Sequence, residues 1–123
     1  MRRVDAVLVP SRPAYPEGLP LTIYEALCAR TPIVASDHPM FAGHLVDRDS
    51  AMVFRAGDPR DFADAIQRVT DDPVAYRALS ARSAATWRAM QLPVRWGDLI
   101  HRWLADTPED RAWIAAHTLA SNA

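Results

Sequence analysis

Short apolar runs separated by polar turns fill the first half of the chain. Three of these runs have the length and flanking turn residues of buried strands: Val4 to Val9, Ile33 to Ala35 and Ala51 to Phe54. Between them, the pattern predicts a helix over Pro20 to Ala29, with the proline at its first position, and a short helix over Met40 to Leu45. This alternation predicts parallel strands joined by crossovers, which is an α/β layer.

The second half of the chain reads as helices. Apolar residues recur at helical spacing, and each segment opens with a proline start signal. The second of these helices is expected to run towards Met90, and the last to end near Ala120. The four expected starts are Asp58-Pro59, Asp72-Pro73, Pro93 and Thr107-Pro108.

Three strands are few for a doubly wound sheet, which usually has about five or six. The pattern therefore predicts a partial Rossmann-like, three-layer α/β domain with a short parallel sheet and a helical C-terminal tail. We expect residues 1–106 to form the C-terminal half of such a domain, and residues 107–123 to form a C-terminal helix.

Composition narrows the function classes. The formal net charge is −1, which gives no bulk attraction to nucleic acid. All 14 basic residues are arginine, a bias of composition more than of function. The single cysteine, Cys28, allows no internal disulfide and is expected to be a buried, inert thiol. No apolar run is long enough for a membrane span and no signal peptide is evident, which favours the cytoplasm.

The segment Pro16 to Leu27, PEGLPLTIYEAL, follows the first strand and opens a helix. Ligands of open α/β sheets bind just outside the carboxyl ends of the strands, where this segment lies. The amides of Leu21, Thr22 and Ile23 have no acceptor inside the helix, so we expect them to face an anion. Gly18 would let a ligand approach the backbone, and the hydroxyl of Thr22 would add a donor.

Two carboxylates flank this anion site. Glu25 lies one turn into the helix, where it would repel phosphate but accept two hydrogen bonds from a ribose diol. Glu17 precedes the helix and suits sugar hydroxyls. A ligand in which a sugar, a diphosphate and a ribose follow one another would contact Glu17, the helix amides and Glu25 in turn. A nucleotide sugar has this order of groups. The alternative is that both are solvated surface acids and that EGLP is merely a turn.

The stretch VDAVLVPSRPAYPEGLPLTIYEALCARTPIVASD resembles the donor-binding half of GT-B glycosyltransferases of the family 4-like, group 1 type. That family has two glutamates separated by seven residues, matched here by Glu17 and Glu25. The likeness covers roughly residues 4–75 and implies retaining, hexosyl-type transfer from a nucleoside-diphosphate sugar. It implies Glu17 as the catalytic residue on the sugar and Glu25 on the ribose. Gly18, Leu19, Leu21 and Thr22 would face sugar and diphosphate.

Arg12, just after the first strand, could reach a phosphate or could be a solvated loop arginine. The family's acceptor domain and the first half of its donor domain are absent from these residues. A missing N-terminal acceptor domain is thus an expected partner, and the fragment alone is expected to be inactive. Where the family often has a Gly-rich turn, this chain has Asp37-His38-Pro39-Met40.

Other candidate residues favour structural roles. Asp37 and His38 could be an acid/base pair, but turn capping explains them as well. No His or Cys spacing suggests a metal, so neither a metal nor another cofactor is expected. A tryptophan stripe predicts core or interdomain packing; its members are Trp87, Trp96, Trp103 and Trp113. Apolar faces and a free edge on the first strand predict a homo-oligomer.

Two further hypotheses remain at this stage. One is a stand-alone, non-catalytic module that binds a nucleotide or sugar, and the other, weaker, is a nucleotide-sugar epimerase. For the full-length protein, a peripheral place at the inner membrane surface stays open beside the cytoplasmic one.

Overall fold

The computed structural model describes residues 4–118. The chain divides into two compact units, Met1–Met90 and Gln91–Ala123. This division lies ahead of the last two helices, whereas the sequence pattern placed a boundary between residues 106 and 107.

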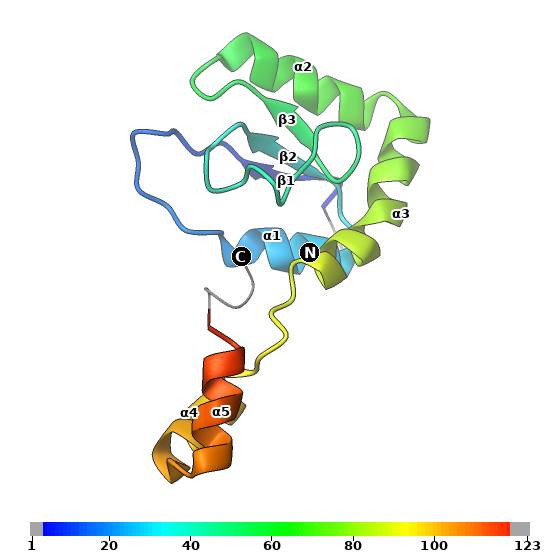
Figure 1. Cartoon of the computed structure of the whole chain (residues 1–123). Coiled ribbons are helices and arrows are strands. Elements are labelled where there is room, and N and C mark those ends of the chain that lie inside the picture. Colours follow the sequence, from blue (N-terminus) through cyan, green and yellow to red (C-terminus); the bar gives the residue numbers. More distant parts are fainter. Residues whose placement is uncertain (1–3, 119–123) are drawn as a thin grey trace. The chain divides into compact units, whose positions relative to one another are not determined.

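The first unit is built on three parallel strands in the order β1-β2-β3 (Figure 1). They are β1 (Val7–Val9), β2 (Ile33–Ser36) and β3 (Met52–Phe54). In the register, Val7 pairs with Ile33 and Val34 pairs with Met52. The predicted α/β class with a short parallel sheet is therefore confirmed, although β1 begins three residues later than the apolar run suggested.

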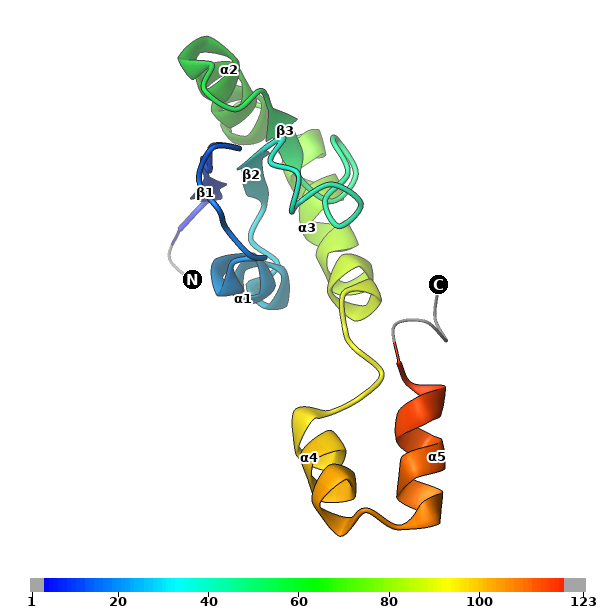
Figure 2. The same ribbon diagram turned by 60° about the vertical axis from the view of Figure 1, so that its left-hand side comes forward.

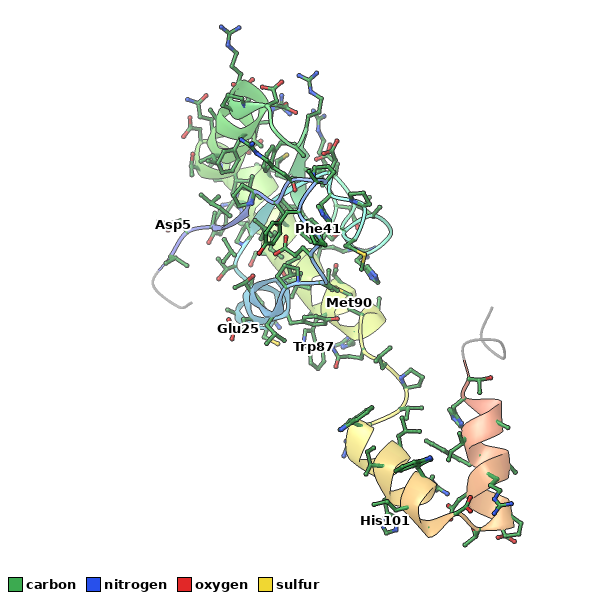
Figure 3. The ribbon with its side chains drawn as sticks, turned by 90° about the vertical axis from the view of Figure 1, so that its left-hand side faces the viewer. Asp5, Glu25, Phe41, Trp87, Met90 and His101 are labelled. Atoms are coloured by element: carbon green, nitrogen blue, oxygen red, sulfur yellow. The ribbon has the colours of Figure 1, made fainter. Side chains whose placement is uncertain are left out.

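Helices cover both faces of this sheet, which gives three layers (Figure 1). On one face, α1 (Leu21–Ala29) packs on β1 and β2; on the other, α2 (Pro59–Thr70) packs on β3 and β2. The third helix, α3 (Pro73–Ala89), contacts both α1 and α2. Trp87 and Met90, at its end, pack in the cluster that contains α1 (Figure 3).

The alternation along β2 explains the two core clusters. Ile33 and Ala35 are buried with α1, whereas Val34 is buried with α2. Successive side chains of a strand point to opposite faces, so a strand buried on both sides is apolar at every position. This is why the run Ile33 to Ala35 shows no polar alternation.

Aspartate caps start α2 and α3, as the sequence predicted. Asp58 accepts hydrogen bonds from the amides of Arg60 (3.0 Å) and Asp61 (3.1 Å). Asp72 caps α3 in the same way. The start of α1 differs from the prediction, since Pro20 is the N-cap in extended conformation (φ −64, ψ 139) and Leu21 is the first helical residue.

Removing the cap of α2 is expected to destabilise the protein. In Asp58→Ala, two first-turn amides lose their acceptor, and the free energy of unfolding should fall by about 0.5–2 kcal/mol. Urea denaturation followed by circular dichroism measures this. The control is Asp64→Ala, an exposed position of the same helix, which should stay within about 0.5 kcal/mol of wild type. Equal losses in both variants would contradict the capping role.

The crossover from β2 to β3 contains no helix, so the short helix expected over Met40 to Leu45 is wrong. Successive turns replace it. The amide of Phe41 donates to the backbone carbonyl of His38 (2.8 Å), and the amide of His44 donates to the backbone carbonyl of Phe41 (3.0 Å). Gly43 has a φ of +82, a left-handed conformation that stops helix propagation. The crossover is held instead by the buried side chains of Phe41 and Leu45.

The second unit is a helical hairpin of α4 (Trp96–Ala105) and α5 (Pro108–Ala116) (Figure 2). The first of these helices begins three residues after the predicted start at Pro93, and the expected end near Ala120 lies outside the described residues. Arg102 pairs with Asp110 (2.9 Å) and lies over the ring of Trp113 (4.6 Å).

The tryptophans of this chain differ in burial. Trp96 and Trp103 are exposed, whereas Trp87 is half-buried against the core of the first unit. The predicted core packing is therefore confirmed for Trp87 but is wrong for Trp96 and Trp103, whereas interdomain packing of these two stays a prediction. Within residues 4–118, no helix combines the length and apolar character that crossing a bilayer requires.

Candidate functional site

Loops that follow the three strands meet at one edge of the sheet (Figure 1). The hydroxyl of Ser36 donates to the carbonyl of Ser11 (2.7 Å), which joins the loop after β1 to the end of β2. The carboxylate of Asp37 accepts from the amide of Ala56 (2.8 Å), which joins the ends of β2 and β3. These bonds hold the loops in fixed positions at the edge where α/β sheets bind ligands.

A shallow, solvent-open hollow of about 460 Å³ lies between two of these loops. Glu17 and Gly18 line it from the loop after β1, and His38 and Met40 from the loop after β2. The structure thus brings the first glutamate of the motif beside the segment Asp37-His38-Pro39-Met40. The full lining is Pro13, Tyr15, Pro16, Glu17, Gly18, His38, Pro39 and Met40.

Both glutamates of the motif carry free carboxylates. Glu17 is half-buried and Glu25 is exposed on α1 (Figure 3). Within residues 4–118, neither carboxylate has a hydrogen-bond or ion-pair partner, unlike those of Asp61 in α2 and Asp110 in α5. Both are therefore available to accept hydrogen bonds from a ligand.

The first turn of α1 offers two backbone donors rather than three. The amide of Ile23 donates to the carbonyl of Pro20 (3.0 Å), so its predicted role at an anion is wrong. The amides of Leu21 and Thr22 have no acceptor among the described residues, nor does the exposed hydroxyl of Thr22. The side chain of Leu19 packs against the core, which leaves only its backbone for a ligand.

Arg12 lies in a second hollow, of about 270 Å³, beside Gly57, Asp58 and Phe62. The structure therefore separates it from the hollow that holds Glu17. Next to this second hollow, the backbone amide of Arg55 donates to Asp61 (2.8 Å) and lowers the pKa of that carboxyl. The charged form of Asp61 is thus favoured in the fold, and this effect is lost as the pH falls through its folded-state pKa.

Asp37 and His38 are not an acid/base pair. The carboxylate of Asp37 accepts a hydrogen bond from the amide of Ala56. Both ring nitrogens of His38 are hydrogen-bonded to backbone atoms, Nδ1 to the amide of Met40 and Nε2 to the carbonyl of Tyr15. Cys28, predicted to be buried, is exposed, because the buried face of α1 is made by Ile23 and its neighbours Ala26 and Leu27. Among residues 4–118, no three His, Cys, Asp or Glu side chains lie close enough to hold a metal ion.

Sequence reasoning missed some lining residues of the hollow. Tyr15 was not singled out, and Met40 was noted only as a departure from a family pattern. The usable signal was topological: the loops after neighbouring parallel strands must converge at one edge. No local pattern marks either residue.

Comparison with known proteins decides the family. The model of the family described as glycosyl transferases group 1 matches residues 1–86. The chain belongs to this family. The resemblance predicted from the two glutamates is thereby confirmed, and the matched residues contain both hollows and the start of α1.

A similar solved structure is the sucrose-phosphate synthase from Thermosynechococcus elongatus, with a TM-score of 0.66 and 24% sequence identity. The match covers 84% of this chain and 26% of that one, so the chain spans about a quarter of that structure. This likeness shows the shared fold. No curated protein matches the chain.

Proposed function

We propose that this chain is the nucleotide-sugar-binding part of a retaining glycosyltransferase of the hexosyl type, which transfers a sugar from a nucleoside diphosphate. One observation supports it above others. Two partner-free carboxylates flank the tip of a helix whose first amides are also without acceptors, at the ligand-binding edge of a parallel sheet.

Each group has a distinct role in this proposal. The amides of Leu21 and Thr22, together with the dipole of α1, bind the diphosphate. Glu25, one turn further along, accepts hydrogen bonds from the ribose, and Glu17 accepts them from the sugar. Arg12, in the neighbouring hollow, neutralises phosphate charge.

The chemical step rests on electrostatic stabilisation. Negative charge builds on the diphosphate as the bond to the sugar breaks, and the fixed amides and helix dipole stabilise that charge without reorganising. Glu17 holds the sugar while this happens. The scheme needs no general base from this chain and no metal ion.

The remaining parts of the enzyme are proposed to lie outside these residues. An N-terminal acceptor domain would close the cleft over the hollow, so the chain by itself is expected to transfer no sugar. Self-association and a cytoplasmic place, with or without peripheral membrane contact, stay predictions.

Calorimetric titration tests the proposal. Nucleoside diphosphates and nucleotide sugars are titrated into the full-length protein, and sugar transfer is assayed in parallel. We expect micromolar to millimolar binding of at least one nucleotide sugar, together with transfer. Binding without transfer by the full-length protein would favour the stand-alone binding module, and no binding of any nucleotide would contradict the proposal.

Gly18 gives a direct test of ligand approach. A Cβ added there would meet no protein atom within 4 Å, and the backbone does not need glycine's conformational freedom. Gly18→Ala should therefore leave the unfolding free energy within about 0.5 kcal/mol of wild type. It should nonetheless weaken nucleotide-sugar binding roughly tenfold, because the methyl group occupies ligand space. Unchanged affinity would show that no ligand approaches this backbone.

A further inference from the structure

His38 connects the two loops that line the Glu17 hollow. Its side chain is 3% exposed, although it lies in a surface loop. The Nδ1 atom lies 3.2 Å from the amide of Met40, and Nε2 lies 3.2 Å from the carbonyl oxygen of Tyr15. The ring also packs against the buried ring of Phe41, with 5.1 Å between centroids.

These two partners determine the position of the imidazole proton. The amide of Met40 can only donate, so Nδ1 must carry a lone pair. The carbonyl oxygen of Tyr15 can only accept, so Nε2 must carry the hydrogen. The neutral Nε2–H tautomer satisfies both partners at once. The Nδ1–H tautomer would break both bonds, and a ring carrying both hydrogens would break the bond to Met40.

The bond to Tyr15 is placed to act on the site. Tyr15 precedes Glu17 by two residues. Tyr15, Glu17 and His38 all line the same hollow. Among the described residues, two side-chain hydrogen bonds tie the segment 11–19 to other parts of the chain. One is from Ser36 to Ser11, at the far end of that segment, and the other is from His38 to Tyr15.

We propose that His38 is a positioning residue for the donor sugar: its Nε2–H bond to Tyr15 holds the Glu17-Gly18 backbone across the hollow. This inference rests on the proposed function, since the sugar is the ligand that Glu17 would contact. It differs from acid/base catalysis, because both ring nitrogens are engaged by backbone atoms.

Two variants separate the roles of the two ring nitrogens. In His38→Gln, the longer side-chain amide can donate where Nε2 donates, but it gives up the acceptor at Nδ1. In His38→Asn, the oxygen can accept from the amide of Met40 in an Asx turn, but nothing reaches Tyr15. The Asn variant thus keeps the local turn and removes only the connection between loops.

The kinetic test measures KM and kcat for the nucleotide sugar in the full-length protein. We expect KM to rise about five- to tenfold in His38→Asn, the size of one lost hydrogen bond, and to stay within about twofold in His38→Gln. A merely structural role at Met40 predicts the reverse order. A larger rise in KM for His38→Gln than for His38→Asn, or equal rises in both variants, would overturn the proposal.

A second readout needs no ligand. The amide of Tyr15 donates to the carbonyl of Arg12 (2.9 Å), so its hydrogen exchange should be faster in His38→Asn than in wild type or His38→Gln, while that of the core amide of Val34 stays unchanged. Nitrogen NMR should find the Nε2–H tautomer in the wild type. Failure of the wild type to bind any nucleotide sugar would reject the proposed function alone, whereas unchanged exchange or an Nδ1–H ring would reject the role of His38.

Discussion

Replacing Phe41 by alanine is expected to lower the free energy of unfolding by about 3–5 kcal/mol. Phe41 is 2% exposed and is among the bulkiest fully buried side chains of the protein. It belongs to a crossover without regular structure, so its side chain, with that of Leu45, anchors this segment in the α1 cluster. The truncation would leave a cavity under the loop and remove the ring that packs against His38.

Chemical denaturation of the wild type and the variant measures this loss. Met40→Ala is the matched control, because Met40 is the preceding residue and is 48% exposed. The control should change the unfolding free energy by less than about 0.5 kcal/mol. A loss below about 1 kcal/mol for Phe41→Ala would mean that the loop is not anchored by this ring. Phe41→Leu should recover most of the stability, because it keeps most of the buried volume.

Local chemistry made some of this fold predictable from the sequence. The caps Asp58 and Asp72 precede prolines, and each carboxylate satisfies first-turn amides of its own helix, so no distant contact is needed. The strand Ile33–Ser36 is apolar at successive positions because it is covered on both faces.

Other features of the fold could not be predicted from local sequence, because they depend on distant contacts or on a helix that is apolar on several faces. Apolar residues lie all around α1, so periodicity could not show that Leu27 is buried while the neighbouring Cys28 is exposed. The Met40 to Leu45 run has helical spacing, but the left-handed Gly43 divides it. In each case the residue types permit two outcomes, and tertiary packing selects one.

The candidate site shows the same division. Glu17, Gly18 and Glu25 form a linear motif and could be predicted because they lie within nine consecutive residues. His38 meets Tyr15 across a separation of 23 residues, which follows from the neighbouring parallel strands rather than from a pattern. A motif within one segment can thus be recognised from the sequence, whereas the distant residue that holds this segment in place cannot.

Glu17→Ala in the full-length protein is expected to lower kcat/KM for the nucleotide sugar by about 10- to 150-fold. This corresponds to the loss of hydrogen bonds to a charged group, worth about 1.5–3 kcal/mol. Because Glu17 is assigned to the sugar, affinity for the free nucleoside diphosphate should stay within about twofold. Glu25 is assigned to the ribose, which both ligands contain. Glu25→Ala should therefore lower the affinities for the nucleotide sugar and for the nucleoside diphosphate by similar factors.

Steady-state kinetics and calorimetry on the same preparations separate these outcomes. Glu109→Ala is the control, since it removes an exposed carboxylate of α5 outside both hollows and should leave both affinities unchanged. Equal effects of the Glu17 change on nucleotide sugar and on diphosphate would assign Glu17 to the nucleotide instead. No effect of either glutamate would mean that the free carboxylates around the tip of α1 are solvated surface acids.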